Sequence, residues 1–136
     1  MWEKRIEIRW RDLDGSRHVN NAVYLSYLEE ARSEWLGHVL GGREQVWAFV
    51  LARVAIDYRR ELALDDEAVV VGCRLERLGT SSIRTAEQIH TAGGELAAEA
   101  EAVLVAWDQP TGASRPLTDA ERAALESAAE QVARDE

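Results

Sequence analysis

The 136-residue sequence has little that would hold a fold together covalently or through a metal ion. Its one cysteine, Cys73, excludes an intramolecular disulfide framework and any zinc site built from several cysteines. The three histidines, His18, His38 and His90, are scattered and have no metal-ligand spacing. We therefore expect no metal and no resident cofactor, and a fold that depends on an ordinary hydrophobic core.

Long apolar runs and basic runs are also missing. No apolar run approaches the ~18–20 residues that span a bilayer, and residues 1–10 lack the continuous apolar region of a signal peptide. The formal net charge is −9, with six acidic and two basic residues from Thr118 onward. An acidic chain without a basic run argues against a nucleic-acid surface. We expect a cytoplasmic protein that binds neither nucleic acid nor membrane.

The composition is that of a globular domain, with 46% hydrophobic and 30% charged residues. A chain of this length can bury a core as one domain. No internal repeat, low-complexity segment or linker divides it. We predict a single domain over residues 1–136.

Two periodicities succeed one another along the chain. Residues 2–10 alternate bulky and charged side chains, which is typical of a half-buried strand. From Asn20 or Asn21 apolar residues recur at helical spacing, and Gly41 with Gly42 supplies the stop. The pattern predicts one long amphipathic helix directly after the first strand.

The rest of the chain predicts four strands and a second helix. The strands cover residues 46–62, 68–78, 81–91 and 95–107. The last of these has the alanines and glutamates of a helix, but a Gly-Gly hairpin turn precedes it and β-forming residues end it, which favours a strand. Thr118 and Glu121 form a capping-box signature for a peripheral, acidic helix over residues 118–136. One long helix against an antiparallel sheet of about five strands is an α+β architecture.

The candidate reaction site is the polar turn between the first strand and the long helix. It contains Asp12, Asp14, His18, Asn20 and Asn21. Orphan backbone N–H groups and the positive end of the helix dipole lie where this turn meets the helix, and both can hold developing negative charge. Aspartates also form turns and asparagines also cap helices, so each residue has a structural interpretation as well.

The turn and the order of elements resemble the hotdog-fold acyl-CoA thioesterases, specifically the 4-hydroxybenzoyl-CoA thioesterase-like group. The resemblance covers roughly residues 5–108. It rests on three local motifs, with looser support from Asp57-Tyr-Arg-Arg60 and Leu78-Gly-Thr-Ser-Ser82. The motifs are Asp12-Leu-Asp14, His18-Val-Asn20-Asn21 and Tyr24-Leu-x-Tyr27-Leu-Glu29-x-Ala31-Arg32. One residue departs from the family pattern, because Arg17 stands where the family commonly has glycine.

The resemblance implies a hotdog fold, in which a curved antiparallel sheet wraps one long helix, and the hydrolysis of an acyl-CoA thioester to a free acid and CoA. Asp14 is then the catalytic carboxylate, either as nucleophile or as general base. The backbone N–H of Asn21 polarises the thioester carbonyl. His18 either tunes the carboxylate, contacts substrate or is a hydrogen-bonded loop histidine. Glu29 is a reserve catalytic candidate, because some hotdog enzymes use a carboxylate on the helix.

Coenzyme A also requires cationic side chains at the mouth of its site. The candidate substrate-binding residues are Tyr24, Arg17, Arg59, Arg60 and Arg84. Hotdog protomers bury one flank of the sheet against a partner, so we expect a homodimer or a homotetramer. Two alternatives stay open: an acyl-ACP thioesterase, and a binder of acyl thioesters that has the fold without the activity. The residues do not indicate which acyl group is bound.

Overall fold

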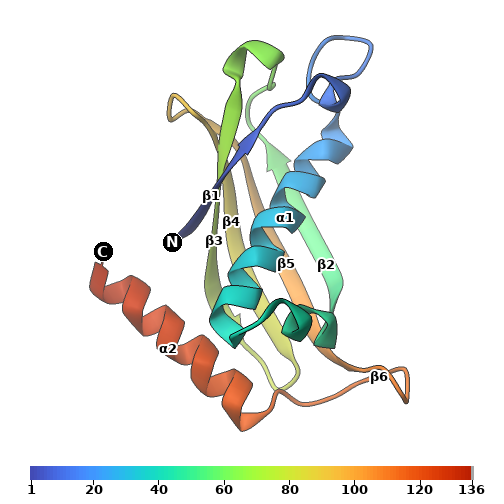
Figure 1. Cartoon of the computed structure of the whole chain (residues 1–136), viewed down its shortest axis with the longest axis vertical. Helices are drawn as coiled ribbons and strands as arrows, with labels where there is room; N and C mark the ends of the chain where they lie inside the picture. Colours follow the sequence, from blue (N-terminus) through green and yellow to red (C-terminus); the bar gives the residue numbers. More distant parts are fainter. Residues whose placement is uncertain (136) are drawn as a thin grey trace.

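The computed structural model describes residues 1–135 as one helix packed on one face of an antiparallel sheet (Figure 1). The helix is α1 (Asn21–Leu40). The sheet order is β1 (Trp2–Glu7), β3 (Ala68–Leu78), β4 (Ser82–Thr91), β5 (Leu96–Asp108) and β2 (Phe49–Tyr58). A two-residue strand, β6 (Ala113–Ser114), pairs with β5. The predicted α+β architecture and its long central helix are confirmed.

The boundaries of α1 follow from its capping residues. The side-chain oxygen of Asn20 accepts a hydrogen bond from the N–H of Ala22 at 2.9 Å, so Asn20 is the N-cap. Gly41 ends the helix in the left-handed conformation, with φ of 84°, and its N–H donates to the carbonyl of Gly37. Both ends therefore lie where the sequence predicts them.

The core lies between α1 and the sheet in two apolar halves. The half at the N-terminal end of α1 includes Tyr27, Leu28, Val69, Val71 and Ile89. The half at its C-terminal end is built from the side chains Trp35, Leu36, Phe49, Ile83, Leu104 and Leu125. Burying each such side chain contributes roughly 1.5–3 kcal/mol. This packing is what holds α1, and so the loop that leads into it, against the sheet.

A buried ion pair connects α1 to β4 within this core. Arg32 is 4% exposed and donates from Nε and Nη2 to the two carboxylate oxygens of Glu87, each at 2.8 Å. The hydroxyl of Thr85 donates to the same carboxylate at 2.7 Å. A bidentate pair with an additional donor satisfies a charge that burial would otherwise make costly. The pair fixes the position of α1 along the sheet.

Two of the predicted strands are shorter than expected. The strand predicted over residues 2–10 ends at Glu7, and Trp10–Asp12 forms a single turn of 3₁₀ helix, η1, that leaves Trp10 79% exposed. The cause is Asp12, whose carboxylate accepts the N–H of Arg9 and turns the chain away from β3. In the segment predicted over residues 46–62, Arg43–Ala48 is a 3₁₀ helix, η2, and only Phe49–Tyr58 is strand.

The remaining elements agree with the patterns to within a residue or two. β3 spans the predicted residues, β4 and β5 begin one residue later, and Gly94 has φ of 95° in the turn between them. The helix α2 (Asp119–Asp135) begins at the predicted capping box, directly after Thr118, whose N–H donates to Glu121 at 2.8 Å. Residue 136 lies outside the described residues. Within residues 1–135 no helix has the length and apolar character needed to cross a membrane.

Candidate active site

The loop between β1 and α1 folds into a small hairpin of its own. Leu13 and Val19 form an isolated bridge, and inside it the Asp14 N–H donates to the carbonyl of His18 at 2.9 Å. The N–H of Arg17 then donates to the carbonyl of Asp14 at 3.0 Å, which closes a tight turn. The Val19 N–H also donates to Leu62 at 2.7 Å, so the segment after β2 fixes the hairpin beside the start of α1.

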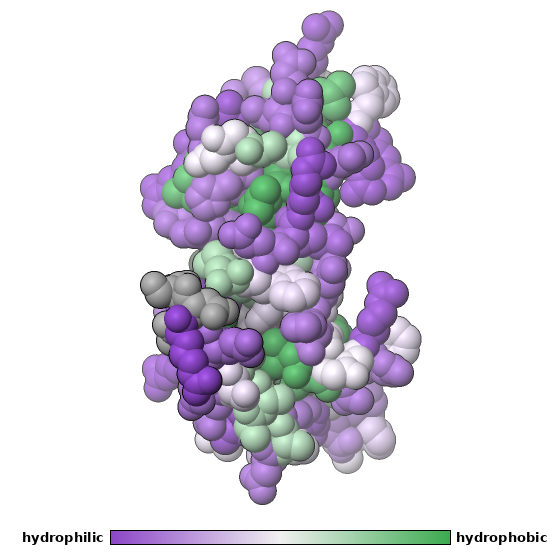
Figure 2. Space-filling model, turned by 60° about the vertical axis from the view of Figure 1, so that its left-hand side comes forward, coloured by the Kyte–Doolittle hydropathy of each residue, from purple (hydrophilic) through white to green (hydrophobic). Residues whose placement is uncertain are grey.

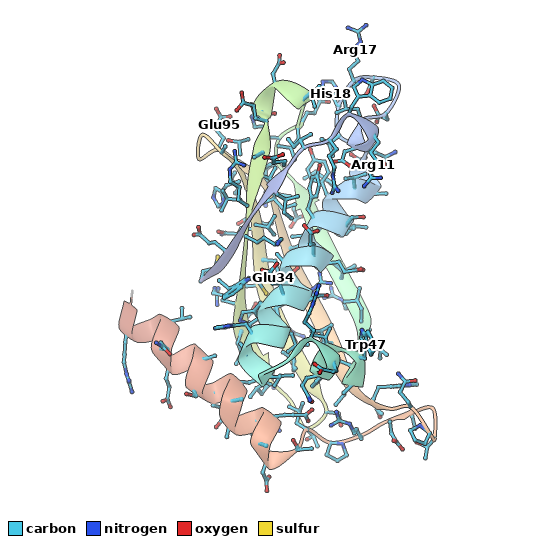
Figure 3. The ribbon with its side chains drawn as sticks, viewed as in Figure 1. Arg11, Arg17, His18, Glu34, Trp47 and Glu95 are labelled. Carbon is cyan, nitrogen blue, oxygen red and sulfur yellow. The ribbon has the colours of Figure 1, made fainter. Side chains whose placement is uncertain are left out.

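Arg17 occupies a left-handed backbone position in that turn, with φ of 67°. Glycine adopts this conformation without steric cost, whereas a residue with a Cβ is strained by it. The glycine that the related family commonly has at this position thus has a backbone explanation. Arg17 keeps the same turn, and Figure 3 shows its side chain pointing away from the body of the molecule.

Asp14 presents an ionised and partly unoccupied carboxylate. Its Oδ1 accepts two hydrogen bonds from Ser16, from the hydroxyl at 2.5 Å and from the N–H at 2.9 Å. The hydrogen bond from the Ser16 hydroxyl is the main reason that the pKa of this carboxyl lies below its usual value. Within residues 1–135 no donor contacts Oδ2. The side chain is exposed, so Oδ2 is free to meet a substrate or a water molecule.

The backbone N–H of Asn21 is the free donor at the start of α1. The neighbouring N–H groups are occupied, because Ala22 donates to the Asn20 side chain and Val23 to the Asn20 carbonyl at 2.8 Å. Among the described residues no acceptor pairs with the Asn21 N–H. Its carbonyl accepts the hydroxyl of Tyr58 at 2.9 Å, which holds this first turn in place. A free N–H at the positive end of a 20-residue helix is suited to bind a developing oxyanion.

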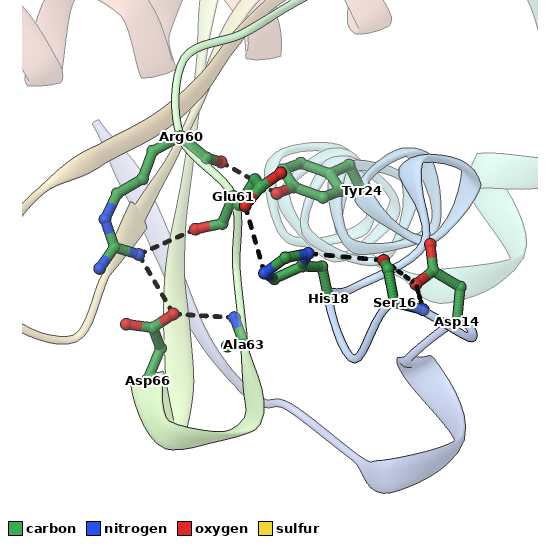
Figure 4. Close-up of polar contacts among 8 residues, drawn as sticks. All are labelled: Asp14, Ser16, His18, Tyr24, Arg60, Glu61, Ala63 and Asp66. Carbon is green, nitrogen blue, oxygen red and sulfur yellow. Dashed lines mark hydrogen bonds and ion pairs between the residues drawn. The ribbon is translucent and has the colours of Figure 1, made fainter.

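His18 connects the Asp14 turn to the segment after β2 (Figure 4). Its Nδ1 lies 3.4 Å from the hydroxyl oxygen of Ser16, and its Nε2 lies 3.2 Å from a carboxylate oxygen of Glu61. Four side chains, Asp14, Ser16, His18 and Glu61, therefore form one line of polar contacts. Neither Ser16 nor Glu61 is among the site residues that the sequence predicts. The Asp-x-Ser turn is a local signal for Ser16, but nothing near Glu61 in the sequence indicates its partner.

The aromatic residues beneath the loop, Tyr24 and Tyr27, support its structure. Tyr24 is 2% exposed, its hydroxyl donates to the carbonyl of Arg60 at 3.0 Å, and its ring meets Tyr58 edge to face. The hydroxyl of Tyr27 donates to Asp12 at 2.7 Å. Burial raises the pKa of both phenols. Tyr24 thus lies in the core rather than on an open pocket wall, and Asp12 holds the loop through hydrogen bonds from Arg9 and Tyr27.

Three of the four arginines predicted to bind substrate form ion pairs with carboxylates of the same chain. Arg60 pairs with Asp66 at 3.1 Å and with Glu95. Arg59 pairs with a glutamate on β5 at 3.1 Å, and Arg84 with another at 3.4 Å. In contrast, Arg11 and Arg17 lie at the loop end of the molecule, where Figure 3 labels both, and neither forms an ion pair within the described chain.

The reserve candidate Glu29 lies more than two turns along α1 from the loop. It is exposed and borders a groove of about 170 Å³ between α1 and β2, together with Arg32, Phe49 and Leu104. No cluster of three or more His, Cys, Asp or Glu side chains within residues 1–135 could hold a metal ion. The chemistry available at the loop is therefore that of a carboxylate beside a polarising amide.

Known proteins resemble this chain in sequence and in fold. The thioesterase-like superfamily matches residues 8–127. Over 130 residues the chain is 32% identical to the long-chain acyl-CoA thioesterase FadM of Escherichia coli (strain K12), covering 91% of this chain and 96% of that protein. A thioesterase of Thermus thermophilus, crystallised with coenzyme A and zinc, has 38% identity and a TM-score of 0.85, covering 94% and 93% of the two chains. The chain therefore belongs to the thioesterase-like superfamily and has the hotdog fold that the sequence resemblance predicts.

Proposed function

We propose that this protein is an acyl-CoA thioesterase, which hydrolyses an acyl-CoA thioester to a free acid and CoA at the loop before α1. The observation that carries the proposal is that two unoccupied groups lie in one short segment: the Oδ2 of Asp14 in the hairpin and the N–H of Asn21 at the first position of α1, directly after the hairpin. Membership of the superfamily, the activity named for FadM and the coenzyme A bound to the Thermus thermophilus thioesterase all support it.

In the proposed mechanism the Asn21 N–H hydrogen-bonds the carbonyl oxygen of the thioester and holds the negative charge that develops there. Asp14 then acts in one of two ways. As a nucleophile, its Oδ2 attacks the carbonyl carbon, CoA leaves as its thiolate, and water hydrolyses the mixed anhydride. As a general base, it takes a proton from the water that attacks. The lowered pKa keeps the carboxylate ionised at neutral pH, which both routes require.

His18 acts in this proposal through the loop rather than on the carbonyl. Its two ring nitrogens connect the Ser16 hydroxyl to Glu61, so it braces the residue that orients Asp14. Exposed Arg11 and Arg17 are the cations available for the phosphates of CoA. Arg59, Arg60 and Arg84 are less suited, because carboxylates of the same chain already occupy them.

We also propose that the protein is a homodimer, or a tetramer built from dimers, joined along β2. This strand is one end of the sheet order, so its outer backbone groups are unpaired. Large apolar side chains are exposed along it and just before it, with Trp47 at 77%, Leu51 at 45% and Tyr58 at 44%. Sedimentation velocity tests this: Leu51→Glu should shift the protein toward monomer. The equally exposed Leu64, changed to Glu as the control, should leave the assembly unchanged.

The function is tested by measuring hydrolysis over a series of straight-chain and aromatic acyl-CoAs, with acyl-ACP substrates beside them. We expect saturable release of CoA from at least one acyl-CoA. Hydrolysis of acyl-ACP alone would favour the carrier-protein alternative, for which Arg11 and Arg17 would face an acidic protein surface. Saturable binding of acyl-CoA without hydrolysis of any thioester would favour the non-catalytic alternative.

A further inference from the structure

A second cavity lies at the other end of α1, beneath the C-terminal helix. It has a volume of about 460 Å³ and is bounded by the last turns of α1, the edge formed by β1 and β3, and one face of α2. Figure 1 shows α2 passing beside β3 and the C-terminal end of α1. His38 is 17 residues after Asn21, so about 25 Å of helix separates this cavity from the candidate active site.

The walls of the cavity combine apolar side chains, two indole rings among them, with the polar side chains of His38, Arg74 and Gln131. Trp2 from β1 and Trp35 from α1 face Leu75 and Val132, and two alanines of α2 complete the wall. Figure 2 views the molecule from the α2 side and shows apolar residues among hydrophilic ones on this face. A volume of this size lies within the range of sites for small organic ligands, about 300–1,000 Å³.

Two polar features of the cavity have no partner in the described chain. The indole N–H of Trp2 is fully buried, so a ligand in the cavity cannot reach it, and it makes no hydrogen bond with residues 1–135. Its ring is held in place by His38, which stacks on it at a centroid distance of 4.7 Å. Arg74, on the strand that pairs with β1, borders the cavity and forms no ion pair among the described residues. Arg74 is therefore the wall residue that is available to pair with an anionic ligand.

The charge around the cavity identifies the kind of ligand. The chain as a whole carries −9, yet none of the acidic side chains that the structure describes lines this cavity. Arg74 is the one described wall residue whose side chain carries a formal charge. We propose that this cavity is a second ligand site that binds an amphipathic monocarboxylate. The carboxylate pairs with the Arg74 guanidinium, while the apolar body packs between the indoles and α2. The proposal does not depend on the proposed hydrolysis.

Titration of the full-length, ¹⁵N-labelled protein with decanoate tests the proposal, because each of the five tryptophans gives its own indole N–H signal. Trp2→Phe identifies the signal of Trp2. We expect decanoate to shift this signal saturably, and 1-decanol, which has the same chain without charge, to bind at least about tenfold more weakly. The Arg74→Met variant should lose affinity by a similar factor, since it removes the charge and keeps most of the apolar stem.

Arg77→Met is the matched control, because Arg77 lies on the same strand and does not line the cavity. It should bind decanoate as the wild type does, and Ala128→Trp, which fills the cavity from α2, should abolish binding. The Asp14→Asn variant should retain the shift, which separates this site from the loop. Absence of a saturable shift, equal binding of decanol, or unchanged affinity in Arg74→Met would each overturn the proposal. A Trp2 shift that depends on protein concentration alone would instead assign the surface to contact between copies of the chain.

Discussion

Replacing Asn21 with proline removes a single backbone donor and leaves the rest of the loop in place. Proline is favoured at the first position of a helix, where its missing N–H would have no helical partner. The preceding residue, Asn20, has φ of −59° and ψ of 137°, and this ψ is the one that a residue before proline adopts. The backbone carbonyl at position 21 is unchanged by the substitution and still accepts the hydroxyl of Tyr58. We therefore expect the free energy of unfolding to change by no more than about 1 kcal/mol.

The effect on catalysis should be much larger than the effect on stability. Loss of one donor to an oxyanion costs about 10²–10³ in kcat, or about 2.7–4 kcal/mol in the activation free energy. The assay is steady-state hydrolysis of the best acyl-CoA substrate, with urea denaturation of the same samples. Asn21→Ala is the control, because it changes the same side chain and keeps the N–H, and it should turn over at close to the wild-type rate. The reasoning is refuted if Asn21→Pro is folded and as fast as Asn21→Ala.

Three further outcomes follow from the contacts around the loop and in the core. Because Ser16 lowers the pKa of Asp14, activity should be lost only as pH falls through that lowered value, and Ser16→Ala should move the acid limb of the kcat/KM profile to higher pH. Arg32→Met leaves Glu87 buried without its cation and should lower the free energy of unfolding by about 3–5 kcal/mol in urea titrations; a loss below about 1 kcal/mol would contradict this. At the left-handed position of Arg17, the Gly variant should be more stable than the Ala variant by about 1 kcal/mol, as thermal unfolding can measure.

The sequence was sufficient for the fold because its patterns are local. Period-two alternation identifies β3, and the Gly-Gly turn with its following β-forming residues correctly resolves β5 as a strand despite its alanines. Trp10 shows where local patterns fail. It continues the parity of the first strand, but Asp12 accepts hydrogen bonds from Arg9 and from Tyr27, 15 residues away, and the chain leaves the sheet.

The site was only partly predictable from the sequence, because only contacts between residues close together in the chain leave a local pattern. Asp14, His18 and Asn21 lie within one stretch of eight residues, so a motif can reveal them together. Glu61 meets His18 only because the segment after β2 returns to the loop, and Arg32 meets Glu87 across 55 residues. Nothing in the residues near each partner encodes such contacts. The roles of the site residues stay predictions. The left-handed backbone at Arg17 explains the glycine that the family commonly has there, and nothing in the structure explains the arginine.

The most direct test of the central claim is the turnover number of Asp14→Asn on the best acyl-CoA substrate. Asparagine keeps the shape of the side chain but supplies neither a carboxylate nucleophile nor a base, so kcat should fall by about 10²–10⁴. Asp65→Asn, which alters an exposed aspartate in the turn before β3, is the matched control and should retain wild-type turnover. Turnover by a folded Asp14→Asn protein equal to that of the control would contradict the assignment of Asp14 as the catalytic carboxylate.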